Sequence, residues 1–328
     1  MRISTTMVMK NYAKELNDKY ESINQYNDQI STTLAFQRGS EDPVAYMKSI
    51  ESCTEYSVNQ QQQQTQKEAS SWMQTTESTL KSLNGIITSA SEKATEAANT
   101  GTYNNSDYKT FAANFKSYRD ELVSTLNTSY NGQYVFGENA SGPVPFQLDS
   151  NGHLQYCDYN GVLGTKNAYV TLQGNDKATL NSMDLKNPIE IGANYNFDIA
   201  TSAIDTVING GTTTSSTNLV DQLSDVIGQL SQNPPVISGL SGLLTATTDA
   251  QGSVTTVNVT IGEKSNMLTQ IGTTLTNNET NLTSSLGNTM EVDSTKAILN
   301  YNMAETVYKE SMSMASTILQ NSLFDFLK

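Results

Sequence analysis

The sequence predicts a mainly α-helical protein with a β-rich insert, in which coiled-coil helices from both ends of the chain form a rod that carries a central domain. Three observations lead to this fold class. Apolar residues near both ends recur in alternating steps of three and four, which is the spacing of coiled-coil helices. Proline and glycine, which interrupt helices, concentrate in the middle of the chain. Short runs of β-branched and aromatic residues in the same middle part predict strands.

The first expected helix carries a heptad seam with one polar interruption. Its members are Ala13, Leu16, Tyr20, Ile23, Asn27, Ile30 and Leu34. An asparagine such as Asn27 can fix the register of a coiled coil. The same spacing predicts further helices between Met73 and Ala97 and between Tyr108 and Leu122, separated by a loop from Gly101 to Asp107. The glutamine run Gln60–Gln64 is expected within one long helix, because glutamine is a good helix former.

The heptad pattern resumes after the middle region. Four apolar residues recur at intervals of seven, at Ile261, Leu268, Leu275 and Leu282. The last expected helix has its apolar or small residues at Ala297, Tyr301, Ala304, Tyr308, Ala315 and Ile318. The stretch near Gly287 and Asn288 is the expected break between these two helices.

The middle region is expected to be β-rich. Five of the six prolines and fourteen of the 20 glycines lie between residues 131 and 252. Strands are expected at 134–136, 169–172 and 254–259, where β-forming residues stand between turn residues. Short helices are expected at 202–209 and 218–230, where the spacing of apolar residues is helical.

These patterns divide the chain into three expected domains. Residues 1–35 and 300–328 are expected to form a terminal helical domain. Residues 36–137 and 251–299 are expected to form a helical rod domain. Residues 138–250 form the β-rich insert, whose ends lie close together on the rod, as is common for inserted domains.

Composition and charge exclude several classes of function. The formal net charge is −14, and no run of lysine and arginine offsets it, which argues against nucleic-acid binding. No run approaches the roughly 18 apolar residues that a membrane span needs. The first residues are polar and do not resemble a Sec signal peptide. We therefore expect no nucleic-acid partner and no insertion into a membrane.

The residues that usually carry catalysis are scarce. His153 is the single histidine, so a zinc site built on two histidines is impossible, and we expect it on an exposed turn. The two cysteines, Cys53 and Cys157, are too few for a disulfide framework and are expected to be free thiols. The sequence contains no phosphate-binding loop and no dinucleotide fingerprint. The chain is therefore not expected to be an enzyme or to hold a metal or cofactor.

Four short segments resemble the flagellar hook-associated protein 3 family of bacterial flagellar proteins. They are Met1-Arg2-Ile3-Ser4-Thr5, the turn Arg38-Gly39-Ser40-Glu41-Asp42-Pro43-Val44-Ala45, Gly132-Gln133-Tyr134-Val135-Phe136-Gly137 with Pro145-Phe146, and Ser322-Leu323-Phe324-Asp325-Phe326-Leu327. In the turn, Asp42 can cap the next helix and Pro43 occupies its first turn. The chain departs from the family at 36–38, where a Gly-Lys-rich turn is usual, and at Phe326, where tyrosine is usual. Apart from Pro145-Phe146, the insert at 138–250 matches no segment of that family.

The resemblance implies a structural subunit that is exported unfolded by the flagellar type III apparatus and acts outside the cell. Such a subunit assembles as a ring between hook-associated protein 1 and flagellin, and its implied partners are these two proteins, like subunits and a flagellar export chaperone. Its terminal helices pair to line an inner tube, and its insert projects outward. The expected subunit interface comprises Leu16, Ile23, Ile30, Leu34, Tyr301, Tyr308, Ile318, Leu323, Phe324, Phe326 and Leu327. In the isolated monomer, side chains such as Ile23 are expected to face water, and the segments near 1–35 and 300–328 to be poorly ordered.

Three other interpretations remain open. A flagellin shares the paired terminal helices, although it usually ends in a Leu-Leu-Arg-type tail. Another type III-secreted coiled-coil protein, such as a translocator, normally carries a long apolar stretch. An enzyme inserted at 138–250 is a further alternative, but the single histidine excludes the His-Glu-x-x-His peptidases found in some flagellins.

Overall fold

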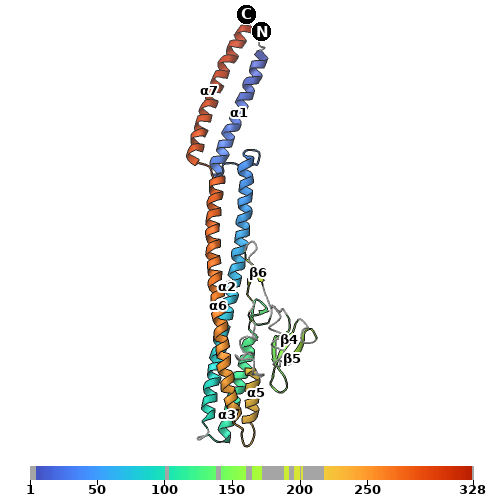
Figure 1. Cartoon of the computed structure of the whole chain (residues 1–328). Helices are drawn as coiled ribbons and strands as arrows, with labels where there is room; N and C mark the ends of the chain where they lie inside the picture. The colour runs from blue at the N-terminus through green and yellow to red at the C-terminus, as the bar shows by residue number, and fades with distance from the viewer. Residues whose placement is uncertain are drawn as a thin grey trace. The chain divides into compact units, whose positions relative to one another are not determined.

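The computed structural model describes residues 5–99, 103–137, 142–159, 165–171, 188–191, 196–199, 201 and 218–326. These residues contain six helices and seven short strands, shown in Figure 1. The chain divides into two compact units, one made of residues 1–60 and 276–328 and the other of residues 61–275. The helices α2 (Pro43–Ala98) and α6 (Gly239–Met290) contribute to both units. The predicted fold class, mainly helical with a β-rich insert, is confirmed.

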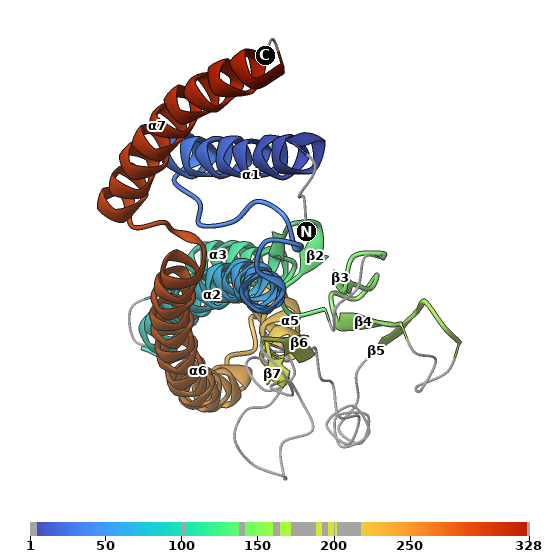
Figure 2. The same cartoon turned by 90° about the horizontal axis from the view of Figure 1, so that it is seen from above.

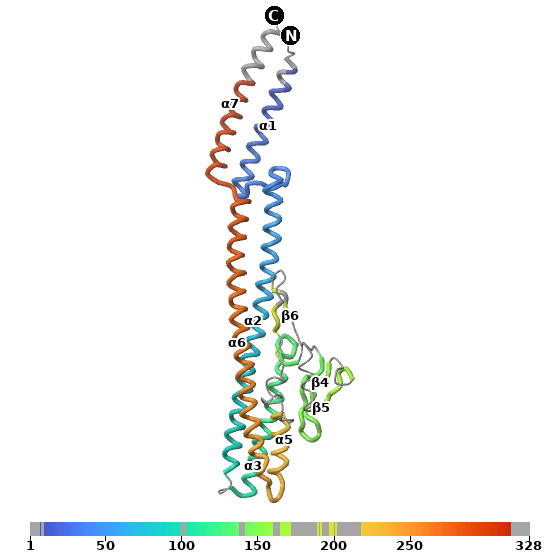
Figure 3. Tube along the Cα trace, viewed as in Figure 1, coloured from blue at the N-terminus to red at the C-terminus, as the bar shows by residue number. Residues whose placement is uncertain are grey.

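In the first unit, the helices nearest the two ends of the chain lie side by side. These are α1 (Thr5–Thr32) and α7 (Ser294–Phe326), blue and red in Figure 3. The rings of Tyr20 and Tyr308 pack with centroids 6.1 Å apart. The hydroxyl of Tyr12 donates a hydrogen bond to the carbonyl oxygen of Ser311. The predicted pairing of terminal helices is therefore present within one chain.

The start of α2 has the geometry that its sequence predicts. Asp42 Oδ1 accepts hydrogen bonds from the backbone N–H groups of Val44, at 3.1 Å, and Ala45, at 2.9 Å. These donors have no partner inside the helix, so the carboxylate acts as the cap. Pro43 is the first helical residue, where its missing N–H carries no penalty.

In the first unit, the segment that connects α1 to α2 and the segment that connects α6 to α7 are hydrogen-bonded to each other through their backbones. The segment after α1 and the segment after α6 form an antiparallel bridge between Leu34 and Glu291. Ala35 N–H donates to the Met290 carbonyl at 2.7 Å, and Val292 N–H donates to the Thr33 carbonyl at 3.0 Å. Helix α7 therefore begins three residues after this bridge, and α2 begins nine residues after it.

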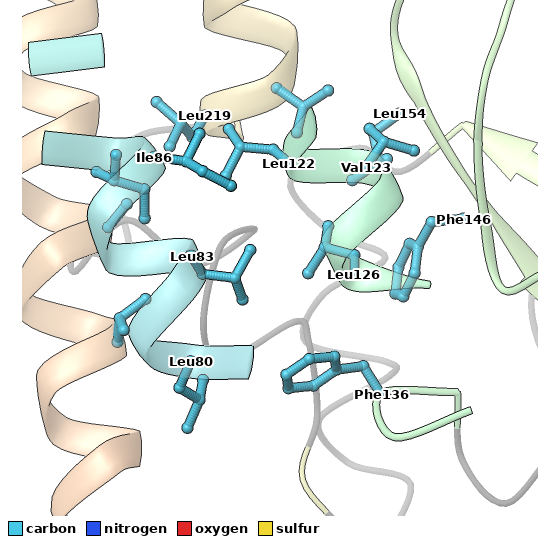
Figure 4. Close-up of a cluster of buried hydrophobic side chains, with 14 of the residues drawn as sticks. Leu80, Leu83, Ile86, Leu122, Val123, Leu126, Phe136, Phe146, Leu154 and Leu219 are labelled. Carbon is cyan, nitrogen blue, oxygen red and sulfur yellow. The ribbon is translucent and has the colours of Figure 1, made fainter. Parts of the chain in front are cut away.

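The second unit is built on helices. The later part of α2 packs with α3 (Asn105–Leu126), α5 (Leu219–Leu230) and the earlier part of α6, and Figure 2 shows these four helices gathered with the strands beside them. In Figure 4, Leu83 of α2 and Leu126 of α3 point into a shared apolar cluster that also takes in Phe136 and Phe146. All four of these side chains are buried. This unit therefore holds a continuous hydrophobic core.

The strands of the second unit form three small antiparallel sheets. The strands are β1 (Ser129–Tyr130), β2 (Gln133–Tyr134), β3 (Phe146–Leu148), β4 (Leu154–Asp158), β5 (Ala168–Thr171), β6 (Pro188–Glu190) and β7 (Asn196–Asp198). β3, β4 and β5 pair in that order, with Tyr156 opposite both Phe146 and Val170. The sheet is fixed to α5 because Asp221 Oδ1 accepts a hydrogen bond from the Leu154 N–H at 2.8 Å.

Two predictions about secondary structure are wrong. Residues 254–259 lie inside α6 and not in a strand. The heptad spacing that buries Val254 and Ile261 places them on one helix face, and this packing overrides the β-propensity of the segment. The break expected at Gly287 lies at 291–293, where Asp293 Oδ1 accepts from Thr295 N–H at 3.0 Å and caps α7.

Other predictions about local structure have mixed outcomes. The helix expected at 218–230 is confirmed as α5, with Asn218 as its cap. Of the strand expected at 134–136 only Tyr134 belongs to β2, and the strand expected at 169–172 is β5 as far as Thr171. The helix expected at 202–209 lies outside the described residues. The glutamine run at 60–64 lies within α2, as predicted.

The cysteines and the histidine occupy separate environments. Cys53 is exposed on α2, Cys157 is buried on β4, and both thiols are free, as predicted. Burial raises the pKa of the Cys157 thiol. His153 lies beside the turn between β3 and β4, but it is only half-exposed, and its Nε2 lies 4.0 Å from Asp225 Oδ1 of α5.

Candidate assembly surface

The first part of α2 has a polar interior face. Ser49, Ser52, Tyr56 and Asn59 follow alternating steps of three and four, and Ser49, Ser52 and Asn59 are at most 7% exposed. The Tyr56 hydroxyl donates to Glu279 Oε1 of α6 at 3.3 Å, and both also contact the Gln60 side-chain amide. A heptad seam normally holds apolar residues, so this stretch gains little from hydrophobic burial.

The outward face of the same stretch carries four exposed apolar residues, together with the exposed Glu51, Thr54 and Glu55. Val44 is 79% exposed and Met47 is 71% exposed, and Ile50 and Val58 are about half exposed. Helical spacing places these four residues on one side of α2, opposite the polar seam. We call these four residues the α2 stripe. The usual amphipathic arrangement, apolar inside and polar outside, is thus reversed here.

Helix α7 carries apolar residues both on its packed face and on its exposed surface. The face that packs on α1 holds Ala297, Tyr301, Ala304, Tyr308, Ser311 and Ala315, which are buried or half-buried. The other face exposes Leu299, Met303, Val307 and Met314, which we call the α7 stripe. Their exposed fractions run from 43% to 63%. Exposed apolar residues beside the packed face of a helix provide apolar surface for contact with other molecules.

Exposed apolar side chains concentrate in the first unit. Among the described residues, thirteen of the seventeen large exposed hydrophobic side chains belong to it, although it is the smaller unit. Its fully buried hydrophobic residues among those described are Phe36 and Ala297. Scattered exposed apolar residues are normal on any protein, but aligned stripes on neighbouring elements mark an interaction surface.

Metal-binding groups and membrane-spanning helices are absent from the part of the chain that the structure describes. The described residues hold no group of three or more histidine, cysteine, aspartate or glutamate residues that could bind a metal ion. None of the helices in the described part of the chain is long and apolar enough to cross a membrane.

Comparison with known protein families finds a similarity in the N-terminal part of the chain. Residues 3–141 match the model of the bacterial flagellin N-terminal helical region. This part of the chain is similar to the N-terminal helical region of bacterial flagellins. It comprises α1, α2 and α3, and so contains the α2 stripe and the cap at Asp42. The match supports a structural role in a bacterial flagellum.

Several solved structures share the fold. A Vibrio parahaemolyticus protein assigned to the flagellar hook-associated proteins matches with a TM-score of 0.60 at 19% identity, over 76% of this chain and 100% of that one. Flagellar hook-associated protein 3 of Legionella pneumophila matches with a TM-score of 0.54 at 10% identity, over 73% and 97% of the two chains. FlgL of Bacillus cereus matches with a TM-score of 0.50 at 15% identity, over 72% and 99%.

At these identities the likeness shows the fold. Two of the three proteins are described as flagellar hook-associated proteins, which agrees with the resemblance found in the sequence. Comparison with curated protein sequences gives no match.

The N-terminal residues predicted for the interface lie in the α1–α7 pair. Leu16, Ile23 and Ile30 are half-buried, on the helix that packs on α7. The expectation that Ile23 faces water in the monomer is therefore wrong, because α7 of the same chain covers part of this face. Leu34 is also half-buried, in the backbone bridge to Glu291.

The C-terminal residues predicted for the interface are placed only in part. Tyr301 and Tyr308 lie on the α1-facing side of α7. The side chains of Ile318, Leu323, Phe324 and Phe326 lie outside the described residues, although their backbones belong to α7. Leu327 lies outside the described residues altogether. The assembly role of these residues stays a prediction.

Sequence reasoning missed both outward stripes. On α7 a second set of apolar residues, in steps of mostly four, runs beside the heptad seam from Leu299 to Met314. On α2 the seam that contains Met73 can be traced back in steps of three and four to Ser49, and it is polar from Ser70 to Ser49 apart from Tyr56. Either signal could have indicated a face that needs a partner outside the chain.

Proposed function

We propose that this protein is a structural subunit of the bacterial flagellum that assembles as the junction ring between hook-associated protein 1 and the flagellin filament. The observation that carries the proposal is the reversed polarity of α2, whose buried seam contains Ser52 and Asn59 while its exposed face contains Val44 and Met47. A monomeric helix gains nothing from this arrangement. A subunit that buries this outward face against another protein on assembly gains stability, because the apolar side chains are then removed from water.

The free energy available from burying the exposed side chains of the two stripes is large enough to favour assembly. Complete burial of one such side chain contributes about 1.5–3 kcal/mol. The α2 and α7 stripes together hold eight of them in each copy. Even partial burial would therefore offset a substantial part of the cost of association, which is about 4–15 kcal/mol.

The remaining parts of the proposal rest on the family resemblance. The subunit would be exported unfolded by the flagellar type III apparatus, kept soluble by an export chaperone, and would act outside the cell. Its partners would be hook-associated protein 1, flagellin and like subunits. Residues 1–35 and 300–328 would line the inner tube, residues 36–137 and 251–299 would form the rod, and residues 138–250 would face outward.

The location of the protein in the flagellum tests this function directly. Electron microscopy of purified hook–filament structures, with this protein labelled by an antibody, should show label confined to a band at the junction. A strain that lacks the protein should keep its hooks but lose its filaments, and the wild-type chain should restore them. Label along the whole filament, or filaments that form without the protein, would contradict the proposal.

A filament subunit is the second candidate, because residues 3–141 match a region defined for flagellin itself. Purified protein seeded on isolated hooks separates the two. A junction protein would add a short collar and stop, whereas a flagellin would extend into long filaments.

A further inference from the structure

An Asn-Gly pair forms the tip of the hairpin between β1 and β2. Asn131 has a φ of 50° and Gly132 has a φ of 79°. On either side of them, Tyr130 of β1 pairs with Gln133 of β2. Two residues with positive φ between paired strands form a type I′ turn, for which Asn-Gly is a preferred sequence.

An asparagine that precedes a glycine can lose its side-chain amide without an enzyme. The backbone nitrogen of the glycine gives up its proton and attacks the side-chain carbonyl carbon of the asparagine, a new C–N bond forms, and ammonia leaves. Water then opens the five-membered succinimide ring at either of its carbonyl carbons, which gives aspartate or isoaspartate. Glycine favours this reaction because it has no side chain to hinder the approach. Access to the glycine nitrogen and freedom of the backbone therefore decide the rate.

We propose that Asn131 is a site of spontaneous deamidation, and that it reacts faster than the other Asn-Gly pairs in the described part of the chain. Asn131 and Gly132 are both exposed. A Cβ added to Gly132 would have no described atom within 4 Å, so the space around the attacking nitrogen is open. This chemistry does not depend on the proposed function.

The turn can open far enough for the ring to close. Closure requires Asn131 to leave its left-handed conformation for an extended one, and the left-handed conformation is unfavourable for residues other than glycine. The strands that hold the turn have two residues each, Ser129–Tyr130 and Gln133–Tyr134. Local opening at the tip of such a short ladder costs little free energy.

The pair Asn151-Gly152 is held much more firmly. The Gly152 N–H, which contains the attacking nitrogen, donates to the Asp149 carbonyl oxygen at 3.1 Å. The Gly152 carbonyl oxygen accepts from the Ser224 hydroxyl of α5. Gly152 is buried, and a Cβ added to it would overlap Nη1 of Arg119. The nitrogen is therefore both hydrogen-bonded and enclosed.

The pair Asn84-Gly85 is protected by helical structure. Both residues lie well inside α2, where backbone N–H groups donate to the carbonyl oxygen four residues earlier. Ring closure there would require several residues of the helix to unfold together. Two further Asn-Gly pairs, at 160–161 and 209–210, lie outside the described residues and are not ranked.

The product at Asn131 should disturb the hairpin. In isoaspartate the main chain passes through the former side chain, which adds one methylene group to the backbone. A two-residue turn lengthened in this way no longer fits the pairing of the strands beside it. The ring of Tyr130, next to the turn, packs edge to face on Trp72 of α2 with centroids 6.0 Å apart. Trp72 is the single tryptophan of the chain, so its fluorescence reports this contact.

Peptide mapping by mass spectrometry tests the proposal on the full-length protein. The wild type is incubated at mildly alkaline pH, folded in one sample and unfolded in guanidinium chloride in another. The measurement is the mass gain from exchange of NH₂ for OH at Asn84, Asn131 and Asn151. Asn131→Gly is the matched control, because Gly-Gly also suits a type I′ turn but carries no side-chain amide. Asn131→Asp adds the charge of the product without lengthening the backbone.

In the folded wild type we expect the mass gain at Asn131 to be at least about fivefold faster than at Asn84 or Asn151, because the tip of the hairpin opens most easily. The three rates should be similar in the unfolded chain. Equal rates at the three sites in the folded chain would overturn the proposal. So would an unchanged Asn131 in the folded chain over a time in which the unfolded chain reacts.

Trp72 fluorescence tests the consequence for the hairpin. It should change in step with the mass gain in the wild type and stay constant in Asn131→Gly. Asn131→Asp should match the unreacted wild type before incubation. If it matches the reacted wild type instead, the charge and not the longer backbone disturbs the hairpin, and that part of the proposal is wrong.

Discussion

Tyr20 of α1 and Tyr308 of α7 lie 288 positions apart in the sequence, yet their rings pack with centroids 6.1 Å apart. The contact shows that the seam of the N-terminal helix has a partner inside its own chain. Half-burial of Leu16, Ile23 and Ile30 follows from the same pairing. The proposed assembly therefore uses other faces in addition to this seam, and we propose the outward stripes of α2 and α7 for this role.

Ile23→Asp is expected to affect the monomer as well as assembly. The charge would lie in the α1–α7 contact at a cost of about 1–3 kcal/mol, so hydrogen exchange of residues 10–30 should become faster in the isolated chain. Asn27→Asp is the matched control, because Asn27 is exposed on the same helix. Equal exchange rates in both variants and the wild type would mean that α1 and α7 do not pair in solution.

The same substitution at two methionines of α2 should change the free energy of unfolding by very different amounts. Met47→Ser removes an exposed side chain and should shift the free energy of unfolding by no more than about 0.5 kcal/mol. Met73→Ser removes a fully buried side chain and should cost about 2–5 kcal/mol. Urea denaturation measures both. A cost of several kcal/mol for Met47→Ser would show that this residue is covered within the monomer.

Asp42→Ala should weaken the first turn of α2. The carboxylate accepts hydrogen bonds from the N–H groups of Val44 and Ala45, so its loss should cost about 0.5–2 kcal/mol. Faster hydrogen exchange of residues 44–46 checks this. The neighbouring substitution Ser40→Ala should leave the exchange rates unchanged. An equal effect of both variants would contradict a capping role for Asp42.

The contribution of Asp221 to stability should depend on pH. Burial raises the pKa of this carboxyl, although it accepts hydrogen bonds from Leu154 N–H and the Asn218 amide. A group with a raised pKa in the folded state contributes most below its unfolded pKa near 3.8 and loses that contribution as pH rises through the folded value.

Asp221→Asn removes this titration. The wild type should therefore hold a larger advantage over the variant in urea denaturation at pH 3.5 than at pH 7. Carboxyl groups that the two proteins share contribute equally to both free energies of unfolding, so their contributions cancel in the comparison at each pH. Asp149, whose pKa is lowered by the backbone N–H of His153, is one of them. An advantage that is constant, or that grows with pH, would contradict the raised pKa.

The sequence was sufficient for the helical parts of the fold. Heptad spacing identified the helices around Leu80, Phe115 and Leu268, because each buries one apolar stripe and the stripe is visible as a period. The cap at Asp42 and the first-turn Pro43 could be predicted because capping depends on adjacent residues. The short strands were harder, since their pairing depends on contacts such as Asp221 with Leu154, 67 positions apart.

The surface for assembly could not be predicted in the same way. The prediction placed the apolar seams of the terminal helices at the interface, because a seam without a visible partner suggests another subunit. In the structure Ile23 and Tyr308 lie in a pair formed within the chain. Which of two apolar faces of α7 remains free is decided by how α1 packs on it, and the sequence of α7 does not specify this.

The most direct test of the account is assembly by a variant that alters only the two stripes. Met47→Ser with Met303→Ser removes one large exposed side chain from each stripe, and Val259→Ser with Met267→Ser removes two from the second unit as a matched control. The measurement is the fraction of isolated hooks that bind labelled protein and then support filament growth. The account predicts a fall of about tenfold or more for the stripe variant, as expected when two exposed side chains that become buried are lost, and wild-type values for the control. Wild-type binding by the stripe variant, or equal loss in both, would contradict the claim that these stripes assemble the protein.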